Sequence, residues 1–396
     1  MAINFPNSPV NGNTYTYSGI KYTYVDAGGG YWKVSTPGSV GIANAAEINA
    51  GTEAVKYVTP EELALSKYAG GAGIANTPAG NITAENVQDA IDQLEGMVGR
   101  KNVIINGNFN VWQRGNSFSA IDSDEYVADR WLHRRDGSGA TVNVNQSTFA
   151  LGQTDVPNSP KHYLTFNASV AGVGATYNNM QQRIEGVQTL SGKTVTLTFF
   201  AKAGSAYTVP ISTTQNFGTG GSPSADVDKA LGNVDLTTSW QKFKITTTLG
   251  SVSTKTLGTD GNDYLAVLIG MPTNQICTVD VAQVQLEEGA LATGFEGRSI
   301  GEESSLCERY YQHEGYSDTD AFPVYNSTSV LARRGILRFR SRMRSVPTVT
   351  FSFLGSNWSS TPNIQDVSRT QANFSGTATS SNIRTVLYDW QADAEL

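Results

Sequence analysis

The sequence contains little cysteine, little histidine and few charged residues. Among 396 residues there are two cysteines, Cys277 and Cys307, and three histidines, and charged residues make up 16% of the chain. Two thiols do not form the disulfide framework of a small secreted protein, which favours assembly in a reducing cytoplasm. His133, His162 and His313 are far apart in the sequence and lack metal-ligand spacing, so we expect neither a metal nor a cofactor.

The sequence also lacks a long hydrophobic run and an excess of basic residues. No apolar stretch approaches the ~20 residues of a membrane helix, so no membrane insertion is expected. The formal net charge is -7, which argues against nucleic acid as a partner. The first residues have neither the basic region nor the apolar core of a signal peptide, and we expect none.

Catalytic motifs are missing as well. The sequence has no Walker-type phosphate loop, no Gly-x-Ser-x-Gly and no His-Glu-x-x-His. Asp122, Asp124 and Glu125 lie near one another and are candidates for a glycosidase pair, but such clusters are more often solvated loops. We therefore expect a binding protein and not an enzyme, with a polysaccharide depolymerase as a third alternative.

The residues that are abundant indicate a mainly β protein. There are 40 glycines, and Thr, Ser, Asn, Val and Tyr recur throughout, which is typical of strands joined by many turns. Changes in composition divide the chain into a small N-terminal β module (1–34), a helical linker and neck (35–100), a large β domain (101–298) and a smaller C-terminal β domain (299–396).

Residues 1–34 contain many aromatic residues between turn signals such as Asn11-Gly12. So small a unit has little interior of its own, so its aromatic residues are expected to pack against a separate structure. The alternative is a hairpin folded back on its own chain. The aromatic residues are Tyr15, Tyr17, Tyr22, Tyr24, Tyr31 and Trp32.

The linker predicts two helices, one from about Thr59 to Gly70 and one from about Thr83 to Gly99. The second helix carries an apolar stripe with heptad spacing. An isolated helix of ~15 residues is marginal in water, so the stripe needs a partner surface. We predict that copies of the same helix supply it and form a short coiled-coil neck; the alternative is packing on the following β domain. The stripe consists of Val87, Ile91, Leu94 and Val98.

Residues 101–298 predict a jelly-roll β-sandwich made of many short strands. Thr194–Phe200 alternates between apolar residues and threonine, and Tyr264–Ile269 is a continuous apolar run typical of a strand covered on both faces. The alternation slips by one residue between Val281 and Val284, which predicts a β-bulge.

Residues 299–396 predict a short helix around 302–311, followed by a second, smaller β-sandwich. Its most regular feature is a long alternating strand from Ile336 to Phe353, interrupted by Pro347. On that strand, apolar side chains fill one face and arginines occupy the other. The arginines are Arg338, Arg340, Arg342 and Arg344.

Two groups of residues are candidates for binding a glycan or an anion. Trp112 and Arg114 can stack on a sugar ring and bind its hydroxyls, although a core position for Trp112 and Trp131 and a structural pair of Asp129 and Arg130 are favoured. The four arginines of residues 338–344 repel one another unless anions face them. Carboxylates of a neighbouring strand or subunit are the favoured partners, and an anionic glycan is the alternative.

Several short motifs together resemble a bacteriophage tail fibre or fibre-like virion protein. The stretches 5–12 and 31–33 resemble an N-terminal virion module, and 50–60 and 85–91 resemble fibre-stem segments. The stretch 106–115 with 128–131 resembles the opening of a jelly roll in tail proteins, and 284–289 with 292–296 resembles its close, as in carbohydrate-binding modules. The stretches 306–311 and 343–350 resemble the segment that follows.

This resemblance implies a homotrimer that attaches to other phage tail or virion proteins by its N-terminus and recognises a host cell-surface polysaccharide. It implies a virion location after assembly in the host cytoplasm. The runner-up is a virion adaptor, collar or capsid decoration protein without receptor binding. For the first segment, the resemblance implies a docking surface formed by Phe5, Pro6, Tyr15, Tyr17, Tyr22, Tyr24 and Trp32.

Overall fold

The structure is a computed structural model. It describes residues 5–17, 20–26, 29–34, 77–78, 84–87, 89–91, 101–121, 123–314, 325–326, 332–354, 363–377 and 387–396. Two compact units are present, Met1–Val98 and Gly99–Leu396. In the part of the chain that the structure describes, no helix has the length and apolar character needed to cross a membrane.

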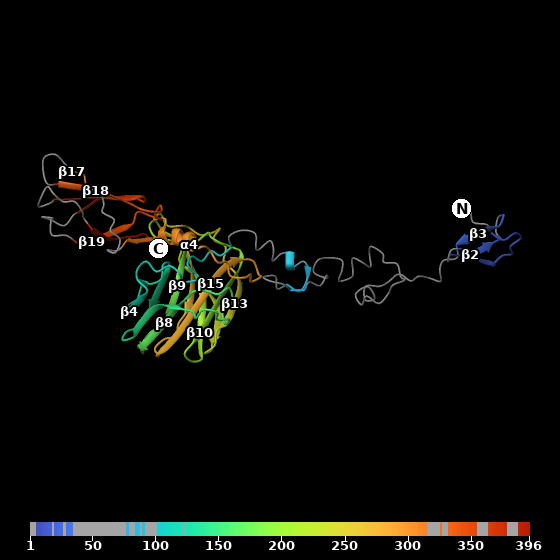
Figure 1. Cartoon of the computed structure of the whole chain (residues 1–396), viewed down its shortest axis with the longest axis horizontal. Helices are drawn as coiled ribbons and strands as arrows, with labels where there is room; N and C mark the ends of the chain where they lie inside the picture. The colour runs from blue at the N-terminus through green and yellow to red at the C-terminus, as the bar shows by residue number, and fades with distance from the viewer. Residues whose placement is uncertain are drawn as a thin grey trace. The chain divides into compact units, whose positions relative to one another are not determined.

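The first unit contains a small antiparallel sheet of β1 (Thr14–Tyr17), β2 (Ile20–Val25) and β3 (Tyr31–Val34) (Figure 1). Its aromatic residues pack against one another. The ring of Phe5 stacks on Trp32 with centroids 5.1 Å apart, and it meets Tyr22 edge-on at the same distance. Tyr22 is only 9% exposed. The module therefore has a small interior of its own, as the hairpin alternative expected; docking to the virion stays a prediction.

The predicted neck falls mostly outside the described residues. The described part forms a helical turn, in which the Asn86 side-chain oxygen accepts a hydrogen bond from the Asp89 amide, as an N-cap does. Val87 is half-buried in this turn, and Ile91 is 47% exposed. Leu94, Val98 and the predicted helix of residues 59–70 lie outside the described residues, so the coiled coil stays a prediction.

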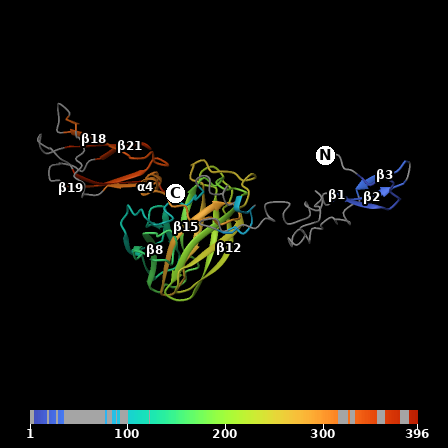
Figure 2. The same ribbon diagram turned by 45° about the vertical axis from the view of Figure 1, so that its right-hand side comes forward.

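The second unit begins with a β-sandwich of two six-stranded antiparallel sheets (Figure 2). One has the order β13-β10-β15-β8-β7-β4, and the other has the order β12-β11-β14-β9-β6-β5. The strands are β4 (Ser117–Ile121), β5 (Glu125–Tyr126), β6 (Trp131–Arg135), β7 (Thr141–Thr148), β8 (His162–Val170), β9 (Asn178–Glu185), β10 (Thr194–Ala203), β11 (Tyr207–Asn216), β12 (Val227–Leu236), β13 (Gln241–Thr248), β14 (Tyr264–Gly270) and β15 (Cys277–Glu288).

Both sheets contribute to one hydrophobic core, which confirms the predicted sandwich of short strands. Leu197 and Phe199 on β10 are buried in it, as their alternation with threonine predicted. The predicted bulge is also confirmed: the β10–β15 register shifts between Thr198 and Phe200, opposite Gln283, whose φ is 49°. The bulge keeps apolar residues on the core side of β15 before and after the slip.

The C-terminal segment starts with helix α4 (Ile300–Glu308), which Ser299 and Glu302 begin with a capping box. Two small sheets follow, with the orders β16-β22-β19 and β17-β18-β21-β20. They share a core that includes Leu337, Phe374 and Trp390, so a smaller sandwich is formed. The strands are β16 (Tyr311–Glu314), β17 (Tyr325–Asn326), β18 (Ala332–Arg338), β19 (Thr348–Leu354), β20 (Asn363–Val367), β21 (Gln371–Thr377) and β22 (Leu387–Asp393).

The long strand predicted from Ile336 to Phe353 is wrong. Strand β18 ends at Arg338 and β19 begins at Thr348, in a different sheet. Between them, the Met343 amide donates to the carbonyl of Arg369, and the buried Met343 side chain joins the small core. The chain therefore crosses from one sheet to the other around Met343. This crossing buries the Met343 side chain in the core between the two sheets.

Stacked arginines fix the C-terminal segment to the sandwich. The guanidinium carbon of Arg114 lies 3.5 Å from the centroid of the Tyr311 ring. Arg309 forms an ion pair with Glu185 on β9 at 2.7 Å. Burial raises the pKa of the Glu185 carboxyl, but hydrogen bonds and the charge of Arg309 outweigh it and hold that pKa below its ordinary value. Residues 99–396 thus form one compact unit.

Candidate functional site

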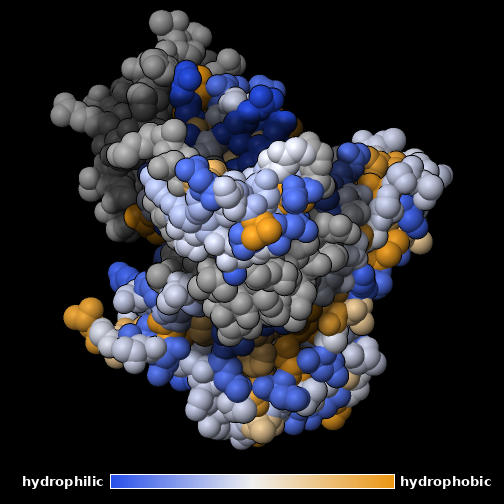
Figure 3. Space-filling view, turned by 90° about the vertical axis from the view of Figure 1, so that its right-hand side faces the viewer, coloured by the Kyte–Doolittle hydropathy of each residue, from blue (hydrophilic) through white to orange (hydrophobic). Residues whose placement is uncertain are grey.

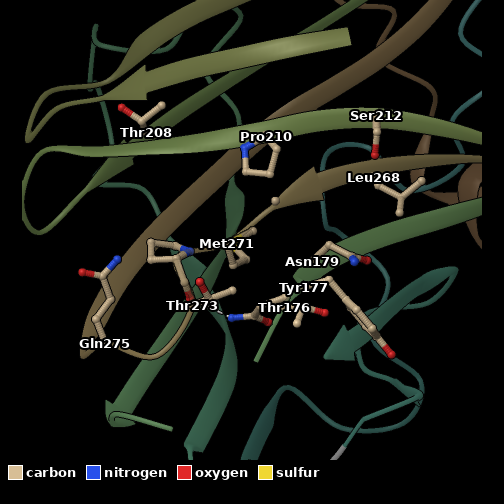
Figure 4. A pocket seen from close by; sticks show the side chains of 13 residues that line it. Thr176, Tyr177, Asn179, Thr208, Pro210, Ser212, Leu268, Met271, Thr273 and Gln275 are labelled. Atoms are coloured by element: carbon tan, nitrogen blue, oxygen red, sulfur yellow. Dashed lines mark hydrogen bonds between the residues drawn. The ribbon is translucent and has the colours of Figure 1, made fainter. Parts of the chain in front are cut away.

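An open groove lies on the outer face of the second sheet, across β9, β11 and β14 (Figure 4). Side chains alternate along β11: Val209 and Ile211 point into the core, so Pro210 between them faces the groove. The same alternation places Leu268 of β14 in the groove and leaves Leu265 and Val267 in the core. The groove has a volume of about 290 Å³.

The groove combines an exposed aromatic ring with short polar side chains. Tyr177, at the edge of β9, is 40% exposed, and Leu268 and Met271 add apolar surface nearby. None of the described residues that line the groove is charged. Its polar side chains are hydroxyls and amides, contributed by Thr176, Asn178, Asn179, Thr208, Ser212, Thr273 and Gln275.

Asn179 is the most unusual polar residue of the groove. Its side chain is on the outer face of β9, because its neighbours in the strand pairings are Arg134 of β6 and Gly270 of β14. Asn179 is only 7% exposed, and no described residue donates a hydrogen bond to its Oδ1 atom. A buried carbonyl oxygen without a donor costs about 1–3 kcal/mol. A ligand that brings a hydroxyl or N–H group to Asn179 would recover that cost.

The loop before β9 is held firmly at the groove edge. The Asp136 carboxylate accepts hydrogen bonds from the Thr176 amide at 2.7 Å, from the Thr176 hydroxyl at 2.6 Å and from the Tyr177 amide at 2.9 Å. The Thr176 hydroxyl and these amides lower the pKa of Asp136. The Asn274 side chain bonds both the amide and the carbonyl of Ala175. These bonds hold the backbone that carries Tyr177 at the groove edge.

Gly270 keeps the strands under the groove close together. A Cβ atom at Gly270 would lie 2.5 Å from the Pro210 carbonyl oxygen and 2.6 Å from Pro210 Cδ. Only glycine permits this approach of β11 to the end of β14. The ring of Pro210 therefore lies against the groove floor, and proline at this position adds a rigid apolar surface beside Leu268.

An exposed ring beside a buried amide oxygen that no described residue bonds is suited to a sugar. The apolar C–H face of a pyranose stacks on an aromatic ring, and its hydroxyls bond with amides and side-chain hydroxyls. The described lining of this groove consists of apolar, hydroxyl and amide side chains. Among the described residues, no group of three or more His, Cys, Asp and Glu is placed to hold a metal ion.

Trp112 and Arg114, the first pair of glycan candidates, lie outside this groove. Trp112 packs against the sandwich core, and its indole N–H donates to the carbonyl of Phe109 at 2.8 Å. Arg114 is committed to the C-terminal segment by its Tyr311 stack and by ion pairs at 3.1 Å to Asp393 and 3.5 Å to Glu395. A role of either residue in glycan binding stays a prediction.

The expected pairing of the neighbours Asp129 and Arg130 is wrong. Asp129 pairs with Arg114 at 3.6 Å, while Arg130 pairs with Glu395. Burial raises the pKa of the Asp129 carboxyl, and the charge of Arg114 opposes this. Arg130 has a φ of 71°, a left-handed conformation that turns the chain between the two residues.

The four arginines of residues 338–344 do not share one strand. Arg338 ends β18 and is exposed, and Arg342 is exposed in the following loop. Arg340 pairs with Glu314 at 2.9 Å and Glu308 at 3.5 Å, which are carboxylates of neighbouring elements. Arg344 donates to the carbonyls of Ala394 and Glu395. Anion binding by these arginines stays a prediction.

The groove itself could not be predicted from the sequence. Pro210 and Leu268 lie on the paired strands β11 and β14, and Tyr177 directly precedes β9, so only the β11–β14–β9 pairing brings the three together. The apolar run Tyr264–Ile269 was the one related sequence feature, and it was expected to be covered on both faces. In the structure Leu268, within this run, is only half-buried. An apolar residue left partly open on a sheet face marks a candidate contact surface.

No protein-family model matches this chain, and no curated protein sequence matches it. Many solved structures are similar to part of it, among them the following three. A family 11 carbohydrate-binding module from Clostridium thermocellum, in complex with a β-1,3-1,4-mixed-linked tetrasaccharide, is 15% identical and covers 44% of this chain and 97% of its own, with a TM-score of 0.27. A putative sugar binding protein from Bacteroides thetaiotaomicron is 14% identical and covers 48% and 100%, with a TM-score of 0.30.

The third is the enzymatically active domain of tailspike protein 4 from bacteriophage CBA120. It is 13% identical and covers 43% of this chain and 22% of its own, with a TM-score of 0.27. All three TM-scores lie below 0.5, so these likenesses carry no inference about the function of this chain.

Proposed function

We propose that this chain is a virion protein of a bacteriophage that binds a host surface glycan in the β9–β11–β14 groove. The observation that carries the proposal is that two residues of the same groove offer complementary groups: Tyr177 has an exposed ring, and Asn179 has a buried Oδ1 atom that receives no hydrogen bond from a described residue. The order of fibre-like motifs along the sequence supports the virion setting. In this proposal the first unit attaches to the tail, three copies join through the neck, and the groove contacts the cell surface.

The uncharged lining favours a neutral glycan. A carboxylated or sulfated sugar needs cationic side chains for compensation. Of the two arginines beside the groove, Arg134 forms an ion pair with Asp124, and Arg135 donates to the carbonyl of Ala140. The lining of the groove therefore fits hydroxyl recognition better than anion capture. On the face of the chain shown in Figure 3, hydrophobic and hydrophilic residues are intermixed.

The test is a glycan array probed with the fluorescently labelled full chain, beside its Asn179→Ala and Asn167→Ala variants. Asn167 lies on β8 of the other sheet, so its variant controls for general effects of losing an amide. Binding of the full chain and of Asn167→Ala to neutral glycans, with weaker binding by Asn179→Ala, supports the proposal. Absence of binding to every glycan favours the runner-up, an adaptor or decoration protein. Release of reducing ends from a bound polysaccharide would instead indicate a depolymerase.

A further inference from the structure

A second hollow lies on the outer face of the C-terminal sheet formed by β18, β21 and β20. Its volume is about 300 Å³, similar to that of the β9–β11–β14 groove. We call it the C-terminal hollow. The side chains that line it include Ile336, Gln365, Asp366, Asn373 and Ser375. Residues on the opposite face of the same sheet, such as Leu337 and Ala372, belong to the small core.

Strand pairing places three of these side chains in one row. Ile336 of β18 faces Asn373 of β21, and Asn373 faces Asp366 of β20. Facing residues on neighbouring strands have Cβ atoms about 4.5–5.5 Å apart. The row therefore places an apolar side chain, an amide and a carboxylate side by side across the sheet.

A β-bulge in β20 adds a second polar group to the row. The β20–β21 register shifts between Ile364 and Asp366. Ile364 and Val367 pack against the small core, so the bulge leaves both Gln365 and Asp366 on the outer face. Two consecutive polar residues thus border the hollow where a regular strand would turn one of them inward.

The polar groups of the C-terminal hollow are available to a ligand. Among the described residues, Asp366 has neither an ion-pair nor a hydrogen-bond partner, and the only bond of the Asn373 amide is to Gln371, which donates to Asn373 Oδ1 at 3.2 Å. The Asn373 amide hydrogens therefore have no acceptor within the described part of the chain. Ile336 is 44% exposed and provides apolar surface next to them.

We infer that the C-terminal hollow is a second glycan site, separate from the β9–β11–β14 groove. Asp366 accepts hydrogen bonds from adjacent sugar hydroxyls, the Asn373 amide donates to a third oxygen, and Ile336 contacts the C–H face of the ring. The single carboxylate repels anionic sugars and is too few for a divalent cation, so the ligand is a neutral, hydroxyl-rich glycan. A polymer that reaches both sites binds with avidity.

The test is affinity electrophoresis of the full chain in native gels that contain a soluble neutral polysaccharide: mixed-linkage β-glucan, xylan, mannan, galactan or dextran. Three variants are compared, Asp366→Ala/Asn373→Ala for the hollow, Tyr177→Ala/Asn179→Ala for the groove, and Asp155→Ala as an exposed control. Thermal unfolding followed by circular dichroism checks that each variant is folded. Because the hollow residues are on the outer face, we expect their unfolding to match that of Asp155→Ala.

If both sites bind, the affinity of the hollow variant for at least one polysaccharide, obtained from its retardation, falls about 10²-fold or more, because avidity is lost. If the hollow variant is retarded like Asp155→Ala, the second site is refuted while the groove proposal stands. If the groove variant is unaffected and the hollow variant is not retarded, the second site stands and the groove proposal fails. If no gel retards the full chain, both are refuted.

Discussion

The guanidinium carbon of Arg130 lies 3.5 Å from the centroid of the Tyr310 ring. Arg130 belongs to the sandwich and is 1% exposed, while Tyr310 follows helix α4 and is 4% exposed. Arg130 also forms an ion pair with Glu395, which is itself buried. One stacked and paired arginine therefore joins the sandwich to the C-terminal segment, and both candidate glycan sites belong to one unit.

Substitution of Arg130 by Ala is expected to destabilise residues 99–396. It leaves the buried Glu395 carboxylate with Arg114 alone, at 3.5 Å. Removal of the whole partnership of a buried charge costs about 3–5 kcal/mol, so a loss somewhat below this range is expected. Chemical denaturation of the full chain, followed by tryptophan fluorescence, measures the change in the free energy of unfolding.

The matched control for this measurement is Lys193→Ala. Lys193 pairs with Glu288 at 2.9 Å, but both side chains are more than half exposed. An exposed pair of this kind contributes about 0–1 kcal/mol. Equal effects of the two substitutions would show that the Arg130 stack does not hold the segment in place.

Substitution of Asp136 by Asn is expected to weaken glycan binding and remove part of its pH dependence. The pKa of Asp136 is lowered in the folded protein, chiefly by the Thr176 hydroxyl, so the ionised carboxylate stabilises the Tyr177 loop. This contribution is complete above the unfolded-state pKa of about 3.9 and is lost as the pH falls through the lower folded-state value. Titration calorimetry from neutral to acidic pH should show the loss in the native chain only. An identical pH profile for Asp136→Asn would exclude this role.

Substitution of Gly270 by Ala is expected to push β11 away from the end of β14. The new Cβ would meet Pro210 backbone and ring atoms at 2.5 Å and 2.6 Å, and overpacking of this kind costs about 1–3 kcal/mol. Glycan affinity should fall as well, since Pro210 lines the groove. Thermal unfolding followed by circular dichroism measures the loss of stability. Gly297→Ala, where a Cβ would meet no atom within 4 Å, is the control. If both variants melt alike, the close approach is not needed.

Substitution of Ile91 and Leu94 by Asp is expected to dissociate the predicted trimer. Ile91 is 47% exposed in the single chain, so its side chain is accessible to the partner helix that the neck prediction requires. A buried carboxylate at this seam is strongly unfavourable. Light scattering should give the mass of three chains for the native protein and of one chain for the variant. A native protein that is already monomeric would refute the neck.

Local patterns predicted the parts of the fold that depend on local chemistry. Apolar alternation located β10, the slip between Val281 and Val284 located the bulge, and the core role of Leu337 and Met343 followed from their spacing. In each case neighbouring residues decide which face is buried, so the period of the sequence is sufficient.

Contacts between distant residues could not be predicted in this way. The register of β9, β11 and β14 brings Tyr177, Pro210 and Leu268 to one groove, and no short stretch encodes that register. The loop around Met343 was predicted as strand because its alternation continues through residue 343, while the hydrogen bond to Arg369 diverts the chain. Pairing partners of charged residues depended in the same way on elements far along the sequence.

The most direct test of the account is the affinity of the full chain and its Tyr177→Ala variant for a neutral glycan identified on the array, measured by isothermal titration calorimetry with a short oligosaccharide. An aromatic platform contributes several contacts to a sugar ring, and loss of an aromatic anchor typically costs about 2 kcal/mol or more, which is about a 30-fold loss of affinity. We predict a loss of at least this size with an unchanged melting temperature. An affinity that Tyr177→Ala leaves unchanged would contradict the groove as the glycan-binding site.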